Sequence, residues 1–184
     1  MKTATAVAML LGCLFGAVGA RAETVDLLLV LASDVSRSID ETEFNLQRKG
    51  YAAAITDPRV LRAIAGGRNH AIAVTFIEWS GAADQNVVVD WTVVRDEEAA
   101  ASVAATMLAA PRSFLGRTSI SAAIDYAVER FAMAPAQADK RILDISGDGT
   151  NNSGRAVTEA RDQAIAAAIT INGLAIINTQ ANTG

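Results

Sequence analysis

Cysteine, histidine and proline are nearly absent from this sequence, whose 184 residues include one cysteine, one histidine and three prolines. Zinc sites need several cysteine or histidine ligands, so this scarcity argues against a zinc protein. A single cysteine, Cys13, also leaves no pair for a disulfide within the chain. Aromatic residues make up only 5% of the sequence and no basic run occurs, so the chain has neither the stacking set nor the positive stripe of a nucleic-acid-binding protein.

The first 22 residues follow the pattern of a signal peptide. Lys2 gives a positive start, an apolar run covers residues 6–18, and Ala20 and Ala22 are the small residues that a signal peptidase reads. A membrane helix is the alternative, but the run is shorter than the roughly 20 residues that span a bilayer, and no later segment is apolar enough. We therefore expect cleavage after Ala22 and a mature domain, residues 23–184, in the periplasm or outside the cell.

The mature chain is acidic and long enough for one domain with a sizeable core. Just over half of the residues, 51%, are hydrophobic. Cleavage removes Lys2 and Arg21 and so shifts the formal net charge from −4 to −6, which further disfavours nucleic acid as a partner. No repeat, linker or low-complexity tract divides the sequence.

Strands and helices alternate along this domain. An apolar run such as residues 25–32 is typical of a strand buried on both faces of a parallel sheet. Asp40 followed by Glu43 is the signature of a capped helix start. The patterns predict strands over residues 25–32, 70–79, 85–94, 141–146 and 170–177, and helices over residues 40–55, 59–65, 96–109, 119–133 and 155–168.

This order predicts an α/β fold. The short link between the second and third strands favours an antiparallel hairpin, while the other strands alternate with helices as in a parallel sheet. We expect a three-layer α/β/α sandwich with a mostly parallel, Rossmann-like sheet and one antiparallel edge strand. The last predicted strand has no helix after it to cover it.

An informative polar motif follows the first strand. Asp34, Ser36 and Ser38 occupy alternate positions, and alternate residues of an extended segment point the same way. Ligands of open α/β sheets bind at the carboxyl ends of the strands, where this motif lies. One carboxylate and two hydroxyls are therefore expected to converge on one point.

Two further segments reach the same edge. Gly116-Arg117-Thr118 precedes a helix, and Asp148-Gly149 follows the fourth strand. Each segment also has an ordinary alternative role. Thr118 is then only the N-cap of the helix, and Asp148-Gly149 is then only a turn. The three segments together offer five oxygen donors, namely Asp34, Ser36, Ser38, Thr118 and Asp148. Carboxylates and hydroxyls suit hard cations such as Mg²⁺, Mn²⁺ or Ca²⁺.

Three motifs, in this order, resemble the metal-ion-dependent adhesion site (MIDAS) of von Willebrand factor A domains: Asp34-x-Ser36-x-Ser38, Thr118 before a helix, and Asp148-Gly149 after the fourth strand. The order of elements resembles that family over nearly all of the mature chain. The resemblance implies that the hydroxyls of Ser36, Ser38 and Thr118 bind the metal, and that Asp34 and Asp148 bind it directly or through water. It also implies Mg²⁺ as the first candidate ion.

The resemblance further implies a protein-binding module whose partner supplies an Asp or Glu carboxylate to the metal. Two other functions stay open. One is a metal-dependent hydrolase of phosphate esters, against which stand the lack of a Gly-rich phosphate loop, of a G-x-S-x-G elbow and of a convincing general base. The other is an assembly subunit that works without metal. The family's sheet also has a further strand and a closing helix that the predicted pattern lacks.

Several residues outside the motif carry their own expectations. Arg37 should point away from the metal, toward solvent or an acidic partner, and Asn151 and Asn152 should shape the loop beside it. Glu78 is expected to face outward from its strand. Asp144 lies inside a strand, where we expect a buried carboxylate paired with a nearby donor.

Overall fold

The computed structural model describes residues 22–177, so the predicted signal peptide, apart from Ala22, lies outside the described residues. Five strands form one sheet in the order β4-β3-β2-β6-β7. All neighbours in it are parallel except β3 and β4, which form the predicted antiparallel hairpin. The strands are β2 (Leu28–Asp34), β3 (Ile72–Trp79), β4 (Gln85–Val94), β6 (Arg141–Gly147) and β7 (Thr170–Ala175).

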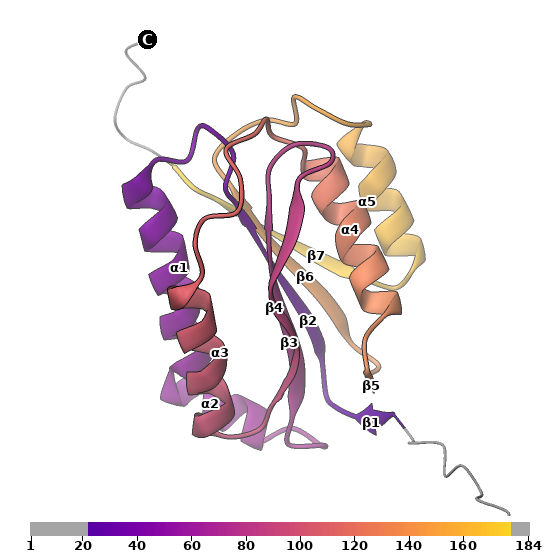
Figure 1. Cartoon of the computed structure of the whole chain (residues 1–184). Coiled ribbons are helices and arrows are strands. Elements are labelled where there is room, and N and C mark those ends of the chain that lie inside the picture. Colours follow the sequence, from indigo (N-terminus) through magenta and orange to yellow (C-terminus); the bar gives the residue numbers. More distant parts are fainter. Residues whose placement is uncertain (1–21, 178–184) are drawn as a thin grey trace, which may run out of the picture.

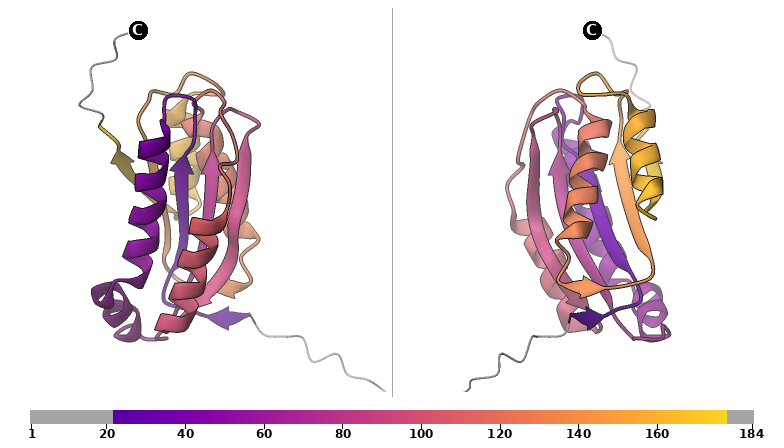
Figure 2. Two further views of the ribbon diagram at one scale, coloured as in Figure 1. Left: turned by 60° about the vertical axis from the view of Figure 1, so that its left-hand side comes forward. Right: turned by 90° about the vertical axis from the view of Figure 1, so that its right-hand side faces the viewer.

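Helices cover both faces of this sheet, which confirms the three-layer sandwich (Figures 1 and 2). A first apolar cluster joins the sheet to α4 and α5, with Val30, Ile124 and Ala164 among its members. A second joins the opposite face to α1, α2 and α3. The helices are α1 (Glu41–Thr56), α2 (Pro58–Ala65), α3 (Glu97–Ala109), α4 (Ile120–Ala132) and α5 (Val157–Ala166).

The first predicted strand starts later than expected, at Leu28 rather than at residue 25. The segment before it belongs to a separate two-stranded parallel sheet, in which β1 (Glu23–Thr24) pairs with β5 (Ala136–Gln137). Between β1 and β2 the Asp26 carboxylate accepts hydrogen bonds from Asn69 N at 2.9 Å and Asn69 Nδ2 at 3.1 Å. These bonds tie the segment before β2 to the loop before β3. Strands of two residues are too short to show a period in the sequence.

The start of α1 is as predicted. Asp40 Oδ1 accepts from Glu43 N at 2.8 Å, and Glu43 Oε2 accepts from Asp40 N at 2.9 Å. This reciprocal pair is a capping box, in which two of the unpaired N–H groups of a helix start are satisfied. Because the cap sets where the helix begins, it also sets where the preceding Asp34–Ser38 loop ends.

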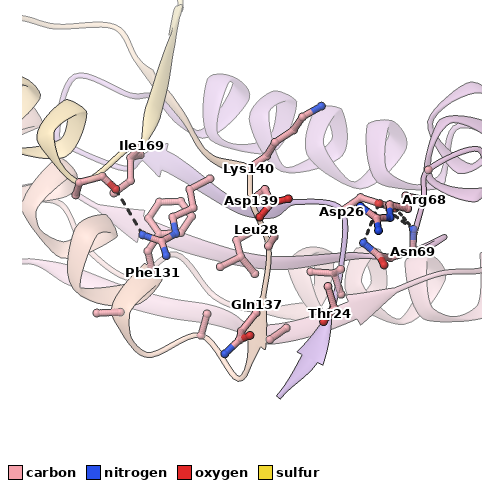
Figure 3. A pocket seen from close by; sticks show the side chains of 18 of the residues that line it. Thr24, Asp26, Leu28, Arg68, Asn69, Phe131, Gln137, Asp139, Lys140 and Ile169 are labelled. Carbon is pink, nitrogen blue, oxygen red and sulfur yellow. Dashed lines mark hydrogen bonds between the residues drawn. The ribbon is translucent and has the colours of Figure 1, made fainter. Parts of the chain in front are cut away.

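A cavity of about 1080 Å³ lies at the amino-terminal end of the strands, beneath α4 (Figure 3). Its lining includes the apolar side chains of Leu28, Phe131 and Ile169 and the charged side chains of Asp26 and Lys140. Hydrogen bonds from Asn69 lower the pKa of the Asp26 carboxyl, so this acid is already paired. The five predicted metal ligands are at the other end of the sheet. Within residues 22–177, no helix is both long and apolar enough to cross a bilayer.

Candidate metal centre

Three parallel strands end at the same level of the sheet. Asp34 at the end of β2 pairs in register with Trp79 of β3, and Ser33 pairs with Ser146 of β6. The loops after β2, β3 and β6 therefore start side by side at the carboxyl edge, the upper edge in Figure 1. The segment that joins α3 to α4 reaches the same edge, since Ser119 N donates to Ser80 O at 2.7 Å.

This edge brings four of the five predicted ligands into one chain of contacts. Asp34 Oδ1 accepts from Ser36 N at 2.7 Å. The hydroxyls of Ser36 and Ser38 lie 3.2 Å apart, and Ser38 Oγ donates to Asp148 Oδ1 at 2.7 Å. Residues separated by 110 positions thus meet through a single hydroxyl. The convergence that alternate spacing predicted for the loop extends to the loop after β6.

Thr118, the fifth residue, faces the same place. Its main-chain N–H donates to Asn152 Oδ1 at 3.0 Å. A Cβ built on Gly149 would lie 3.6 Å from Thr118 Oγ1 and 3.9 Å from Ser38 Oγ, so both hydroxyls border one spot. The alternative role of Thr118 is wrong, because the N-cap of α4 is Ser119, whose Oγ accepts from Ala122 N at 3.3 Å. The Thr118 hydroxyl therefore does not cap α4.

The Asp34 carboxyl is buried, has one oxygen without a hydrogen-bond partner and has a raised pKa. The residue is 0% exposed, and its Oδ2 is a buried oxygen without a hydrogen-bond partner. Burial raises the pKa of this carboxyl to about 6 against the hydrogen bonds from Ser36, and the charge of Asp148 adds to the rise. A Cβ on Gly147 would lie 2.9 Å from Asp34 Oδ2 and 3.4 Å from Trp79, so glycine leaves the space beside that oxygen open.

These features fit a hard cation. A buried carboxylate oxygen without a donor costs free energy unless a counter-charge satisfies it. Within residues 22–177, no three His, Cys, Asp or Glu side chains gather as a metal site. A cation at this edge would therefore be held by Asp34 and Asp148 together with neutral hydroxyls. Such a set leaves the ion short of electron density, and any open position on it then attracts an outside carboxylate.

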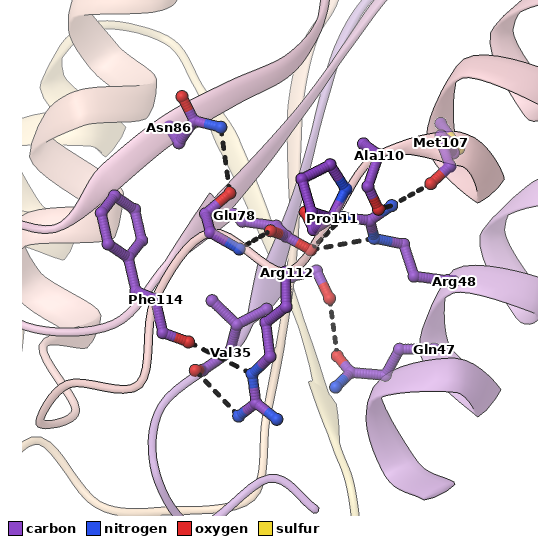
Figure 4. A network of polar contacts seen from close by, with 12 residues as sticks. Val35, Gln47, Arg48, Glu78, Asn86, Met107, Ala110, Pro111, Arg112 and Phe114 are labelled. Atoms are coloured by element: carbon purple, nitrogen blue, oxygen red, sulfur yellow. Dashed lines mark hydrogen bonds and ion pairs between the residues drawn. The ribbon is translucent and has the colours of Figure 1, made fainter. Parts of the chain in front are cut away.

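An arginine that the sequence did not reveal holds the Asp34–Ser38 loop in place (Figure 4). Arg112 Nη2 donates to three main-chain carbonyls of this loop, at 3.0 Å to Val35, 2.8 Å to Ser36 and 2.8 Å to Ile39. One side chain thereby fixes the backbone on both sides of Ser36 and Ser38. The donor lies on the segment that also leads to Thr118, so two of the three loops that carry the predicted ligands are joined directly.

A buried ion pair anchors that segment (Figure 4). Arg48 of α1 donates to Glu78 Oε1 from Nε at 2.9 Å and from Nη2 at 2.6 Å, and Ser113 N donates to Glu78 Oε2 at 2.9 Å. The outward orientation expected of Glu78 is wrong, because its side chain is 0% exposed. All eight residues of β3 are buried, so a charge there has to be paired. Arg48 also donates to the carbonyls of Met107, Ala110 and Pro111.

Other polar side chains tie the loops to their supports. Gln47 Oε1 accepts from Ser33 Oγ at 2.9 Å and Ser146 Oγ at 2.8 Å, and Gln47 Nε2 donates to Asp34 O at 3.1 Å. Asn151 Oδ1 accepts from Ser121 N at 3.1 Å, which together with the contact of Asn152 to Thr118 bears out the predicted shaping role.

Asp144 finds its donor in the neighbouring strand. Asn172 Nδ2 of β7 donates to Asp144 Oδ1 at 2.7 Å. The expected pairing is thus present, although Asp144 is half-buried rather than fully enclosed. Arg37, as predicted, is exposed.

Comparison with known proteins identifies the family. The model of the family described as "Protein of unknown function (DUF1194)" matches residues 24–184. The chain belongs to this family. No curated protein matches it.

Solved structures identify the fold. Proximal thread matrix protein 1 of the mussel byssus, in a structure with a zinc-occupied MIDAS motif, is 17% identical, with a TM-score of 0.67 over 85% of this chain and 39% of that one. The pilus adhesin SpaC of Lactobacillus rhamnosus GG is 11% identical, with a TM-score of 0.61 over 86% of this chain and 26% of that one. A von Willebrand factor type A protein of Catenulispora acidiphila is 15% identical, with a TM-score of 0.58 over 81% and 33%.

This member of the family therefore has the fold of a von Willebrand factor A domain, as its sequence resemblance implied. The chain spans about two fifths or less of the length of these three relatives. At such low identities the likeness concerns the fold alone, so the role of the carboxyl edge has to be argued from its own residues.

Proposed function

We propose that this chain is an exported protein-binding module that holds one divalent cation with Asp34, Ser36, Ser38, Thr118 and Asp148. The single observation that carries the proposal is the buried, partnerless Asp34 Oδ2 at the point where these oxygen donors converge. Mg²⁺ suits the set best, with Mn²⁺ and Ca²⁺ as alternatives, since all of its donors are hard oxygens. The bound ion would supply an attachment point for an Asp or Glu carboxylate of a partner protein.

Binding suits this edge better than hydrolysis. The only histidine of the sequence, His70, precedes β3 and so lies at the opposite end of that strand from the ligands. Its ring Nδ1 is 2.6 Å from Ala65 O, within a bend before the strand. A hydrolase needs a base in reach of the attacking water. In the present arrangement Asp148 is engaged by Ser38, and Asp34 is enclosed.

Calorimetric titration with Mg²⁺, Mn²⁺ and Ca²⁺ tests the metal part of the proposal. We expect saturable binding at one site, and a Ser38→Ala variant should bind at least about tenfold more weakly, because it loses one ligand and the hydroxyl that links the two loops. Ser102→Ala on the exposed face of α3 is the matched control and should bind as the wild type does. A folded protein that binds none of the three ions would refute the site.

Capture of partners separates the two remaining functions. The immobilised protein should retain its partner in buffer that contains the divalent cation and release it when a chelator is added. Capture that persists in chelator would instead favour an assembly subunit that needs no metal. Hydrolysis of phosphate esters that survives purification and is lost in Asp148→Ala would favour the enzyme.

We also propose that the chain is exported and cleaved after Ala22. In support, the first strand begins at Glu23, so this cleavage removes no element of the described fold. Mass spectrometry of the protein recovered from outside the cytoplasm should give a chain that starts at Glu23. A chain that retains residues 1–22 in that fraction would contradict cleavage.

A further inference from the structure

Two arginines flank the metal edge without an acidic partner. Arg37 lies between the ligands Ser36 and Ser38, Arg117 directly precedes Thr118, and both side chains are exposed. Among the ion pairs formed within residues 22–177, none includes Arg37 or Arg117. Both guanidinium groups therefore lie beside the candidate metal centre with their charge available to an acidic group from outside the domain.

The two arginines stand on loops that are joined. Arg37 N donates to Gly116 O at 3.0 Å, so residues 37 and 117 are neighbours across the loop boundary. Arg117 Nη2 donates to Asn152 O at 2.8 Å, which holds this side chain on the loop that follows Asp148. Leu115, on the same segment, is 63% exposed. The rim of the metal site therefore combines two cationic side chains with one apolar side chain.

The acidic residues nearest in sequence are already engaged. Asp40 and Glu43 form the capping box of α1, and Glu41 lies 3.6 Å from Arg112. Arg155, beyond the loop after β6, is paired with Asp125 at 2.5 Å. The charge of Arg37 and Arg117 is thus directed outward rather than neutralised inside the domain.

We propose that Arg37 and Arg117 bind a second carboxylate of an acidic partner segment whose first carboxylate binds the metal. This inference rests on the proposed function. A guanidinium group matches a carboxylate with two parallel hydrogen bonds. In an extended segment, residues two positions apart point the same way and lie about 7 Å apart. One carboxylate of such a segment can then bind the metal while the second meets the guanidinium groups of Arg37 and Arg117, whose backbone adjoins that of the proposed ligands. The preferred partner segment is therefore Asp/Glu-x-Asp/Glu, with Leu115 available to an apolar neighbour.

The test uses three fluorescent peptides of equal length, which contain one glutamate, two glutamates separated by one residue, or two glutamines. Their binding to the purified exported protein is followed by fluorescence anisotropy in saturating Mg²⁺ and in chelator. We expect the two-glutamate peptide to bind about three- to tenfold more tightly than the one-glutamate peptide, because exposed ion pairs are individually weak. This preference should shrink as salt is added.

The decisive variant is Arg37→Gln/Arg117→Gln. It should bind the metal at least as tightly as the wild type, because the variant removes two positive charges beside the cation, and it should bind the one-glutamate peptide nearly as well but lose the preference for two glutamates. The matched control is Arg62→Gln/Arg68→Gln, which changes the net charge equally by altering exposed arginines at the opposite end of the molecule, in and just after α2 (Figure 1). It should keep the preference.

The outcomes separate the two proposals. A wild-type protein that binds the metal but shows no preference between the peptides would overturn the role of the arginines and leave the metal site standing. The same holds for a preference that persists in Arg37→Gln/Arg117→Gln. Tighter binding of a polyuronate than of either peptide would assign the face to anionic polysaccharide instead. Failure of the wild-type protein to bind any divalent cation would overturn both proposals.

Discussion

An Asp34→Asn variant should bind Mg²⁺ at least about a hundredfold more weakly than the wild type, since loss of a charged ligand is worth on the order of 3 kcal/mol. The asparagine keeps the size of the side chain, and its Oδ1 still accepts from Ser36 N, whose bond to Asp34 is 2.7 Å long. The loop should therefore keep its shape. Calorimetric titration of both proteins measures the loss, and circular dichroism establishes that the variant is folded.

The same variant should change how stability depends on pH. The pKa of the Asp34 carboxyl is about 6 in the folded protein, against 3.8 for an aspartate in the unfolded chain. Between these values the folded protein holds the proton more tightly, so the contribution of Asp34 to the free energy of unfolding falls as the pH rises through this range. The loss is complete above the folded pKa and amounts to on the order of 3 kcal/mol. Asp34→Asn should lack this slope.

Bound Mg²⁺ should restore the stability that ionisation of the Asp34 carboxyl removes. In chelator, the stability of the wild type relative to Asp34→Asn is expected to be lower at neutral pH than near the unfolded pKa of Asp34, while saturating Mg²⁺ should reverse the difference because the ion binds the charged form. Denaturant titrations at several pH values, with and without Mg²⁺, measure both effects. Asp139→Asn, an exposed acid at the far end of the sheet, is the control and should behave as the wild type does. A pH slope that is identical in wild type and Asp34→Asn would show that Asp34 is not the group responsible.

The convergence of the predicted ligand side chains at the carboxyl edge of the sheet was predictable because its signals are local. Alternate spacing placed Asp34, Ser36 and Ser38 on one side of a loop, while a helix start placed Thr118 beside them and a strand end placed Asp148 there. A parallel sheet then converts sequence positions at carboxyl ends into neighbours in space. The capping box at Asp40 was equally predictable from the sequence, because it depends on two residues three positions apart.

The supports of that edge were not predictable in the same way. Arg112 reaches the carbonyls of Val35, Ser36 and Ile39 across 73 to 77 positions, and main-chain acceptors carry no sequence signature. Glu78 and Arg48 were no easier to predict. The sequence pattern indicated an outward Glu78, and only the fold shows that both charges are buried and so imply partners. Which residue that partner is depends on how α1 packs over β3, and no pattern within either segment determines this.

Removing Arg48 should have the largest effect on stability of any single change in this network. Arg48→Met is expected to lower the free energy of unfolding by about 3–5 kcal/mol, because it leaves an uncompensated charge in the interior. The Glu78 side chain is 0% exposed, and Ser113 N would remain its hydrogen-bond donor. Denaturant titration in chelator measures the loss without a contribution from metal.

A double variant distinguishes pairing from packing. Arg48→Met/Glu78→Leu removes both charges and should recover part of the loss, since apolar replacement of a whole buried ion pair is often close to neutral. Recovery should be incomplete, because the carbonyls of Met107, Ala110 and Pro111 also lose their donor. Both variants free the segment that carries Arg112, so metal affinity should fall in each although no ligand has changed. A single variant that costs less than about 1 kcal/mol, or a double variant no more stable than the single one, would mean that the ion pair does not anchor the metal edge.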